Sequence, residues 1–133
     1  GNVGTIIRTA DAAGFTGVIV SDKSADIYSL KTLRSMQGSH FHLPIYRMSL
    51  ASFVEEAKKS NLSILATTLS KESKDYRELS PLENFALVMG NEGQGISSVM
   101  AESADQLVHI GMKGRAESLN VAVAAGILMF YFS

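Results

Sequence analysis

The chain has 133 residues, of which 46% are apolar and 19% charged; this balance predicts one globular domain with a substantial core and excludes a disordered chain. No cysteine is present, which excludes disulfides and thiolate metal sites and favours a reducing compartment such as the cytoplasm. The formal charge of −1 excludes a domain that attracts nucleic acid by its overall charge.

A helix and a short strand are predicted at the start of the chain. Asn2 is a good helix cap, apolar residues follow it at helical spacing, and Gly14 ends the segment. These apolar residues are Val3, Ile6, Ile7 and Ala10. Residues 17–20 are an apolar run that predicts a short buried strand.

The next segment predicts two more helices around an extended stretch. Residues 30–36 have the pattern of a short helix, and residues 41–45 that of an extended segment. An amphipathic helix follows, with a possible capping box of Ser52 and Glu55 and an ion pair between Glu55 and Lys59. Its apolar face consists of Leu50, Phe53, Val54 and Ala57.

Residues 27–54 contain no Asp or Glu, although five basic or imidazole side chains fall there. One interpretation is a surface that faces phosphate groups; the other is an ordinary solvated face. The five side chains are Lys31, Arg34, His40, His42 and Arg47.

The second half alternates strands with helices. Residues 62–66 and 85–89 are unbroken apolar runs, as expected for strands covered on both faces, and residues 107–110 predict a further strand. Residues 70–81 are polar and predict an exposed connection with one short helical turn. Residues 119–132 form an apolar run that is shorter than the about 20 residues needed to cross a bilayer. This run therefore predicts a buried helix. The order indicates an α/β domain with a mostly parallel sheet.

A glycine-rich loop follows the apolar run 85–89. It reads Gly90-Asn91-Glu92-Gly93-Gln94-Gly95, and such a loop at the carboxyl end of a strand is a usual ligand position. Gly90 and Gly95 have the spacing of a P-loop, but Ile96-Ser97 stands where Lys and Ser/Thr would be needed. The order of the glycines is also the reverse of the dinucleotide-binding fingerprint, so the loop is not predicted to hold phosphate.

Three segments together resemble the motifs of the SpoU/TrmH family of RNA ribose 2'-O-methyltransferases, which belong to the SPOUT superfamily. They are NVGTIIRTA at residues 2–10, ALVMGNEGQGIS at residues 86–97 and HIGMKGRAESLNVAVAAGI at residues 109–127. The resemblance implies that residues 1–133 form the catalytic domain, with a deep trefoil knot at its carboxyl-terminal end. General topology rules would not predict a knot.

The resemblance also implies S-adenosylmethionine as methyl donor, bound between three loops, and a homodimer in which Arg8 of one subunit approaches the donor of the other. It assigns donor binding to Thr67, Thr68, Gly90, Ile110, Met112 and Leu119.

The same resemblance assigns catalytic roles to Arg8, Asn2, Glu92, Ser118 and Asn120. Because a guanidinium stays protonated, Arg8 is expected to hold the phosphate beside the target ribose and orient its hydroxyl. The alternative for Arg8 is a surface residue that pairs with Asp11.

The other four catalytic candidates also have structural alternatives. Asn2 is a helix cap in the alternative interpretation, and Glu92 a solvated acid. Ser118 would cap the final helix, and Asn120 would satisfy a buried carbonyl.

The predicted partner is structured RNA, with ribosomal RNA favoured over transfer RNA. RNA binding is assigned to Arg8, Lys31, Arg34, His40 and Arg47. No metal site is expected, since no carboxylate lies near His40 and His42 in sequence. A base methyltransferase of the wider superfamily and a non-catalytic knotted module that binds donor or RNA are the alternative functions.

Two departures from the family pattern affect these expectations. Gly111 stands where many relatives have proline, so the donor loop is expected to be more mobile. The strand that precedes the first motif, and any amino-terminal RNA-recognition domain, are expected to lie outside this chain.

Overall fold

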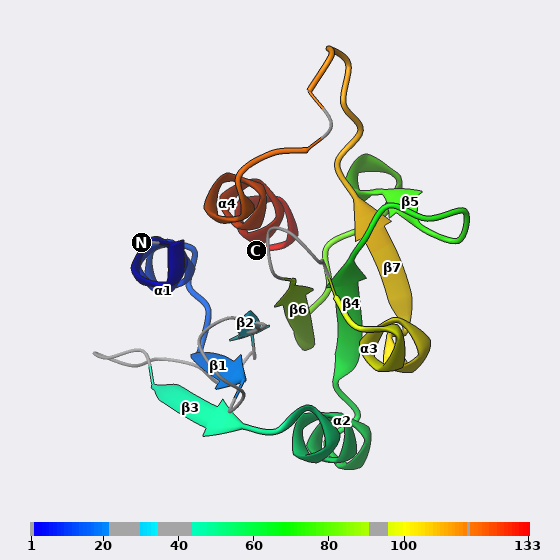
Figure 1. Cartoon of the computed structure of the whole chain (residues 1–133). Helices are drawn as coiled ribbons and strands as arrows, with labels where there is room; N and C mark the ends of the chain where they lie inside the picture. The colour runs from blue at the N-terminus through cyan, green and yellow to red at the C-terminus, as the bar shows by residue number, and fades with distance from the viewer. Residues whose placement is uncertain (1, 22–29, 35–43, 91–95, 117) are drawn as a thin grey trace.

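A computed structural model describes residues 2–21, 30–34, 44–90, 96–116 and 118–133. In these residues a seven-stranded sheet lies between two layers of helices (Figure 1). The strand order is β3-β1-β2-β6-β4-β7-β5. The strands are β1 Gly17–Ser21, β2 Leu30–Arg34, β3 Ile45–Met48, β4 Ser63–Thr67, β5 Lys74–Asp75, β6 Phe85–Met89 and β7 Gln106–His109.

Most neighbouring strands run parallel. The parallel pairs are β1 with β3, β4 with β6, β4 with β7, and β5 with β7, while β2 is antiparallel to both β1 and β6. The predicted α/β class and mostly parallel sheet are therefore confirmed.

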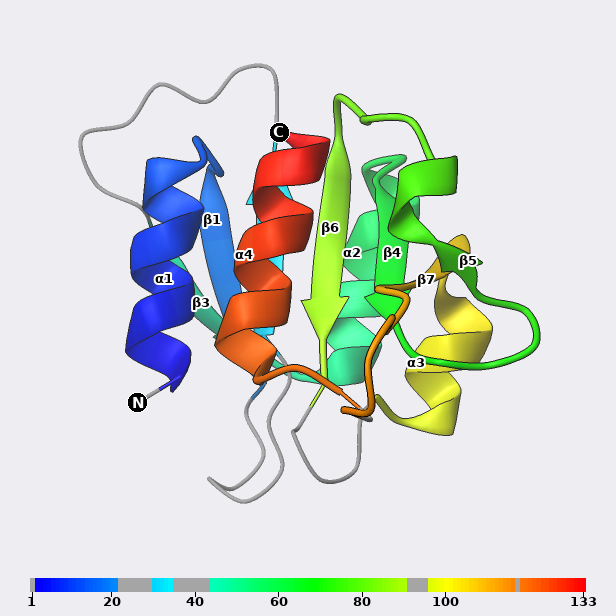
Figure 2. The same ribbon diagram turned by 90° about the horizontal axis from the view of Figure 1, so that it is seen from above.

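Two helices, α1 Asn2–Ala12 and α4 Val121–Phe132, lie side by side on one face of the sheet (Figure 2). Ile6 and Ala10 of α1 are fully buried there, and Gly14 ends the segment with a φ of 82° that suits glycine. The strands contribute alternate residues, such as Phe85 and Leu87 of β6, to the core beneath these helices.

The opposite face is covered by α2 Leu50–Lys59 and α3 Ser98–Ser103. Phe53 and Ala57 of α2 pack with Met100 of α3 against Ala86 and Val88, the residues of β6 that alternate with the first set. The continuous apolar run in β6 thus serves two cores, as predicted for a strand covered on both sides.

Two local predictions were wrong. Residues 30–36 were predicted as a helix, but Leu30–Arg34 form β2. This segment pairs with β1 and β6 at once, and the hydrogen bonds of two strand edges outweigh a weak local preference for helix. The capping box of Ser52 is also wrong, because Ser49 caps α2 and accepts a hydrogen bond from the Ser52 amide. The predicted Glu55–Lys59 ion pair is present, at 3.4 Å.

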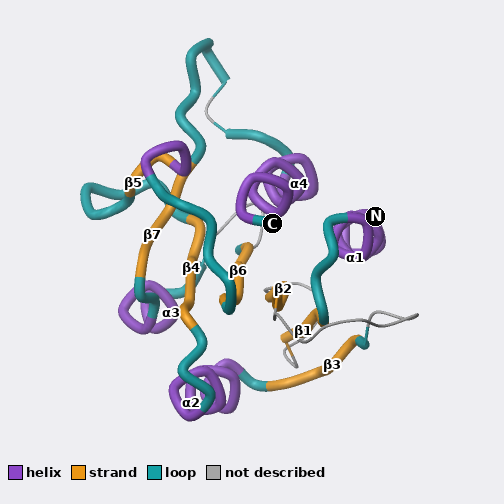
Figure 3. Tube along the Cα trace, turned by 180° about the vertical axis from the view of Figure 1, so that it is seen from behind, coloured by secondary structure: helices purple, strands orange, loops and turns teal. Residues whose placement is uncertain are grey.

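The polar connection after β4 contains β5 and a single turn of 3-10 helix, η1 Tyr76–Glu78. The predicted short helical turn in residues 70–81 is therefore confirmed. It runs from β4 in the interior of the sheet to β5 at the edge, and then back to β6 (Figure 3). The Tyr131 hydroxyl of α4 donates a hydrogen bond to the Leu79 carbonyl at 2.7 Å, so this connection lies against the end of α4.

None of the described helices is long and apolar enough to span a membrane.

Candidate methyl-donor site

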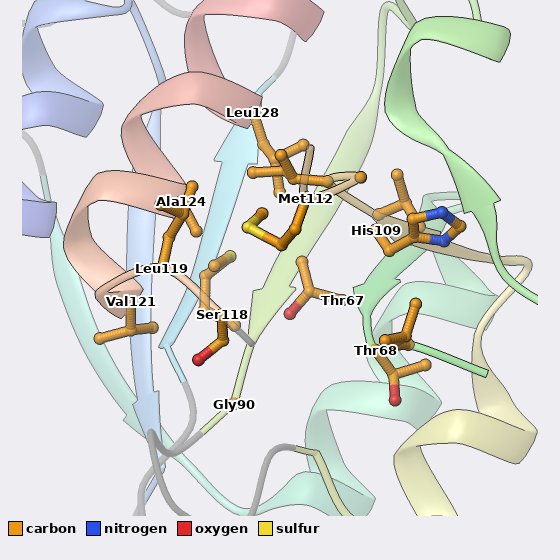
Figure 4. A pocket seen from close by; sticks show the side chains of 15 residues that line it. Thr67, Thr68, Gly90, His109, Met112, Ser118, Leu119, Val121, Ala124 and Leu128 are labelled. Atoms are coloured by element: carbon orange, nitrogen blue, oxygen red, sulfur yellow. The ribbon is translucent and has the colours of Figure 1, made fainter. Parts of the chain in front are cut away.

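The carboxyl ends of β4, β6 and β7 come together beside the first turns of α4, because parallel strands end at the same edge of a sheet. A cavity of about 410 Å³ lies there, a size typical of small-molecule sites (Figure 4). It is lined by Thr67, Thr68, Leu69, Met89, Gly90, Val108, His109, Ile110, Gly111, Met112, Ser118, Leu119, Val121, Ala124 and Leu128.

All six residues assigned to the donor line this one cavity: Thr67, Thr68, Gly90, Ile110, Met112 and Leu119. They come from the ends of β4, β6 and β7 and from the loop before α4, so the fold brings together segments far apart in sequence. Figure 4 shows Thr67, Met112 and Ser118 around the same space.

The threonines at the end of β4 are held by neighbouring strands. The Thr67 hydroxyl donates to the Val88 carbonyl of β6 at 3.1 Å, and the Thr68 amide donates to the Val108 carbonyl of β7 at 3.0 Å. This end of β4 is thereby fixed from both sides.

The loop of residues 110–120 connects β7 to α4 and forms much of the cavity lining. In the described part of the chain, the backbone groups of Met112 and Leu119 make no hydrogen bond, and both side chains are apolar. The loop therefore offers free amide donors and acceptors beside an apolar surface. This combination suits a flat heteroaromatic ring with polar edges.

Two contacts from the connection after β4 hold the beginning of this loop. Ser73 Oγ lies 2.8 Å from His109 Nδ1, and the Gly111 amide donates to Asp75 Oδ2 at 3.1 Å. Neither contact was predicted from the sequence. The only sequence signal was that His109 and Gly111 lie at and just after the carboxyl end of a predicted strand; their partners come from a polar segment with no such signal.

Asp75 is itself held by Arg77. The Arg77 guanidinium donates to both carboxylate oxygens of Asp75, from Nε at 2.9 Å and from Nη2 at 3.1 Å, and the Arg77 amide donates to Oδ1 at 2.9 Å. The side-chain hydrogen bonds from Arg77 hold the pKa of Asp75 well below its usual range, aided by the backbone amides of Arg77 and Gly111. The carboxylate is therefore charged and fixed in orientation at neutral pH.

Asn120 and Asn2, assigned together to the active centre, are in contact. Asn120 Oδ1 accepts from the amides of Ala122 and Val123, at 2.8 and 3.2 Å, so Asn120 caps α4. Its Nδ2 donates to Asn2 Oδ1 at 3.2 Å. The alternative in which Ser118 caps the final helix is therefore wrong. Asn2 is the first residue of α1.

Ser118 lies at the cavity and is exposed. Its hydroxyl makes no hydrogen bond within the residues that the structure describes. It is therefore available to a ligand.

Arg8 does not line the cavity of its own chain. It is exposed on α1 and forms no ion pair with Asp11 or with any other described residue. Within the described residues, the guanidinium therefore has no ion-pair partner.

Among the other predicted RNA-binding residues, Arg47 has a described side chain, and it does not line the cavity. Arg47 is exposed on β3, at the sheet edge opposite β5, while the side chains of Lys31 and Arg34 in β2 are not described. Glu92, His40 and His42 lie outside the described residues. In the described ranges, no three His, Asp or Glu side chains form a group that could hold a metal ion.

Comparison with known proteins identifies a family. Residues 1–130 match the sequence model of the SpoU rRNA Methylase family. The chain is 47% identical over 131 residues to the 23S rRNA (guanosine(2553)-2'-O)-methyltransferase RlmP of Bacillus subtilis (strain 168), a match that covers 98% of this chain and 52% of that protein. The chain thus spans about half the length of this relative.

Two solved structures have the same fold over 98% of the chain. An AdoMet-bound rRNA methyltransferase from Sinorhizobium meliloti has a TM-score of 0.79 and 32% identity, with 50% of its own length covered. The A. aeolicus TrmH/SpoU tRNA modifying enzyme also has a TM-score of 0.79, with 31% identity and 66% of its length covered.

Proposed function

Because this chain belongs to the SpoU rRNA methylase family, we propose that it transfers a methyl group from S-adenosylmethionine to a ribose 2'-hydroxyl of structured RNA, with ribosomal RNA as substrate. Residues 1–133 would act as the catalytic domain. The observation that carries this proposal is the cavity at the ends of β4, β6 and β7, in which all six predicted donor-binding residues meet. A ribosomal RNA substrate would place the protein in the cytoplasm.

The cavity fits an adenosine group. Met112, Leu119 and Leu128 supply apolar contacts for the ring, and the free backbone groups of Met112 and Leu119 supply hydrogen bonds to its polar edge. Thr67 and Thr68 on the opposite side, together with Gly90, would hold the more polar part of the donor. When bound, S-adenosylmethionine supplies the methyl group.

Arg8 is the residue proposed to bind the RNA phosphate beside the target ribose and to orient the hydroxyl. Its exposure and its lack of an ion pair in the described part of the chain support this role. A guanidinium gives strong hydrogen bonds to phosphate but remains protonated, so Arg8 is a positioning cation and not the base. Lys31, Arg34, His40 and Arg47 are proposed as further RNA contacts.

Ser118 and Asn120 are proposed to line the path of the target ribose, with Asn2 and Glu92 beside them. The position of Ser118 at the cavity, with no hydrogen bond from its hydroxyl to another described residue, supports this for Ser118. Asn120 caps α4 and contacts Asn2, and these hydrogen bonds fix its side-chain amide at the start of α4. Holding the hydroxyl in line with the methyl group supplies several kcal/mol, on the order of 7 to 11 in well-oriented systems.

A homodimer is proposed to complete the active site. Arg8 does not line the cavity of its own chain. In a dimer, Arg8 of the second copy would be placed at this cavity. The exposed side of α4 is apolar as a dimer contact requires: Val123 is 52% exposed, Ile127 36% and Phe130 56%. α4 itself packs beside α1, the helix that carries Arg8.

We also propose that the carboxyl-terminal part of the chain forms the trefoil knot. The support is the path of the connection between β4 and β6, which crosses to the sheet edge and returns, together with the contact of Tyr131 with Leu79. In such a knot α4 would pass through the loop that this connection makes.

Transfer RNA is the second candidate substrate, since the A. aeolicus tRNA modifying enzyme matches the chain with the same TM-score as the S. meliloti rRNA enzyme. Methylation assays with ribosomal and transfer RNA, each read at the ribose, distinguish the two. Methylation at a base would overturn the proposed reaction.

Calorimetric titration with S-adenosylhomocysteine tests the donor site directly. We expect stoichiometric binding by the unmodified protein and by Arg8→Ala, and loss of binding by Gly90→Val, because Gly90 lines the cavity and valine adds bulk to its wall. Binding by all three proteins would mean that the donor lies elsewhere, and binding by none would exclude this methyltransferase function.

A further inference from the structure

A carboxylate from another part of the fold holds the backbone of the donor loop at Gly111. Gly111 stands between Ile110 and Met112, both of which line the cavity, and its amide donates to Asp75 Oδ2. Asp75 lies 36 residues earlier in the chain, as the last residue of β5 and the N-cap of η1. The contact therefore joins the sheet edge to the cavity lining.

The contact leaves no room for a side chain at position 111. A Cβ added to Gly111 would lie 2.8 Å from Asp75 Oδ2, closer than a carbon and an oxygen can approach without displacement. The backbone of Gly111 is not in the left-handed region, so any residue could adopt its conformation. Glycine is thus needed here for close approach to Asp75 and not for its conformational freedom.

Asp75 is preorganised for this contact. Its two oxygens receive three hydrogen bonds from Arg77 in addition to the one from Gly111, and the side chain of Asp75 is only 17% exposed. Because Arg77 fixes both the charge and the direction of the carboxylate, Oδ2 presents a constant acceptor to the loop. A charge-assisted hydrogen bond of this kind is about twice as strong as a neutral one.

We propose that Asp75 is a positioning residue for the methyl-donor site: by holding the Gly111 amide, it sets the backbone of Ile110 and Met112 in the geometry that binds the donor. This inference rests on the proposed function. Asp75 does not itself line the cavity, so its effect on the donor passes through the cavity residues that it holds: Gly111 by the hydrogen bond and His109 by strand pairing.

The first test is Asp75→Ser, with Glu78→Ala as matched control. Serine keeps a side-chain oxygen that can cap η1, as Asp75 does, but is too short to reach Gly111. Glu78 is an exposed acid in η1 whose side chain makes no hydrogen bond or ion pair within the described residues. We expect S-adenosylhomocysteine to bind about 10-fold more weakly to Asp75→Ser and unchanged to Glu78→Ala.

Amide hydrogen exchange tests whether the weaker binding by Asp75→Ser comes from a change in the donor loop. In the absence of ligand, a peptide that covers residues 108–116 should exchange faster in Asp75→Ser than in the unmodified protein, whereas peptides from β6 should not change. Unchanged exchange together with unchanged affinity would overturn the positioning role.

A double-mutant cycle makes the test independent of folding defects. Gly111→Ala keeps the amide but brings a methyl group against Oδ2, so it should weaken binding about 10-fold on its own. In the Asp75→Ser background the obstruction is gone, and Gly111→Ala should have no further effect. Additive losses would overturn the proposal.

The binding of S-adenosylhomocysteine separates a protein without a donor site from one in which Asp75 has no role. If the unmodified protein binds no S-adenosylhomocysteine, the proposed function fails and the role of Asp75 fails with it. If the unmodified protein binds and both Asp75→Ser and Gly111→Ala bind equally well, only the role of Asp75 is overturned.

Discussion

Asn120 and Asn2 are 118 residues apart in the chain, yet the Nδ2 group of Asn120 donates a hydrogen bond to Asn2 Oδ1 at 3.2 Å. Asn120 also accepts two amide hydrogen bonds at the start of α4. One side chain therefore caps α4 and connects it to the first residue of α1.

Removal of this side chain should cost stability, whereas removal of its neighbour Ser118 should not. We expect Asn120→Ala to lower the free energy of unfolding by about 1–2 kcal/mol, the sum of a lost helix cap and a partly exposed hydrogen bond. Ser118→Ala, which breaks no contact within the described residues, should leave stability unchanged and reduce methylation. Urea denaturation of both variants provides the comparison. Equal stability of the two would contradict the capping role of Asn120.

A mixed dimer tests the composite active site. Arg8→Ala should retain donor binding without turnover, and Gly90→Val should lose donor binding, so each variant alone is expected to be inactive. Mixing them should restore roughly a quarter of the activity, because roughly half the dimers are mixed and each contains one intact cavity facing an intact Arg8. Activity of the mixture is measured by methyl incorporation into RNA. No recovery after proven subunit exchange would mean that Arg8 acts on its own cavity.

Phe130→Asp should prevent dimer formation without unfolding the chain. Phe130 is 56% exposed on α4, and a buried charge opposite its own symmetry copy has a large desolvation cost. Val99→Asp is the matched control, since Val99 is 57% exposed on α3 at the opposite face of the sheet. Sedimentation velocity should give a monomer for the first variant and a dimer for the second. Dimers of both would exclude the α4 surface as the interface.

The contribution of Asp75 to the free energy of unfolding should decrease as the pH falls. Because the folded state holds the pKa of Asp75 below its ordinary value of 3.8, this group stabilises the fold above that pH and ceases to do so as the solution becomes more acidic. The difference in unfolding free energy between the unmodified protein and Asp75→Asn should therefore be constant from about pH 6 to 8 and shrink below about pH 4. Denaturation curves at several pH values measure it. A difference that grows on acidification would contradict this linkage.

Local patterns in the sequence predicted most of the elements but not their pairing. The apolar run of β6 and the spacing of Ile6 and Ala10 depend on nearby residues, so they could be read directly. The strand Leu30–Arg34 could not, because its conformation depends on two partners, β1 and β6, that are distant in sequence. The order of the strands was likewise outside the reach of local patterns.

The same distinction applies to the site. Gly90, Met112 and Leu119 were predicted because they belong to segments that resemble family motifs, and Thr67 because it follows the apolar run 62–66; the cavity unites all four. Asp75 and Ser73 were missed because they belong to a polar connection with no pattern of its own, and their importance comes only from contacts with Gly111 and His109. Arg77 gains its role in turn from Asp75.

The cavity has one wall, formed by Val121, Ala124 and Leu128, that comes entirely from α4. Strand ends alone do not enclose the space, so the cavity exists only after α4 has packed on the sheet. A molecule that binds there is bound to the finished fold and not to any earlier compact state. Bound ligand therefore shows that the chain has completed folding. Saturating ligand should slow the detachment of α4 from the sheet more than the detachment of α2.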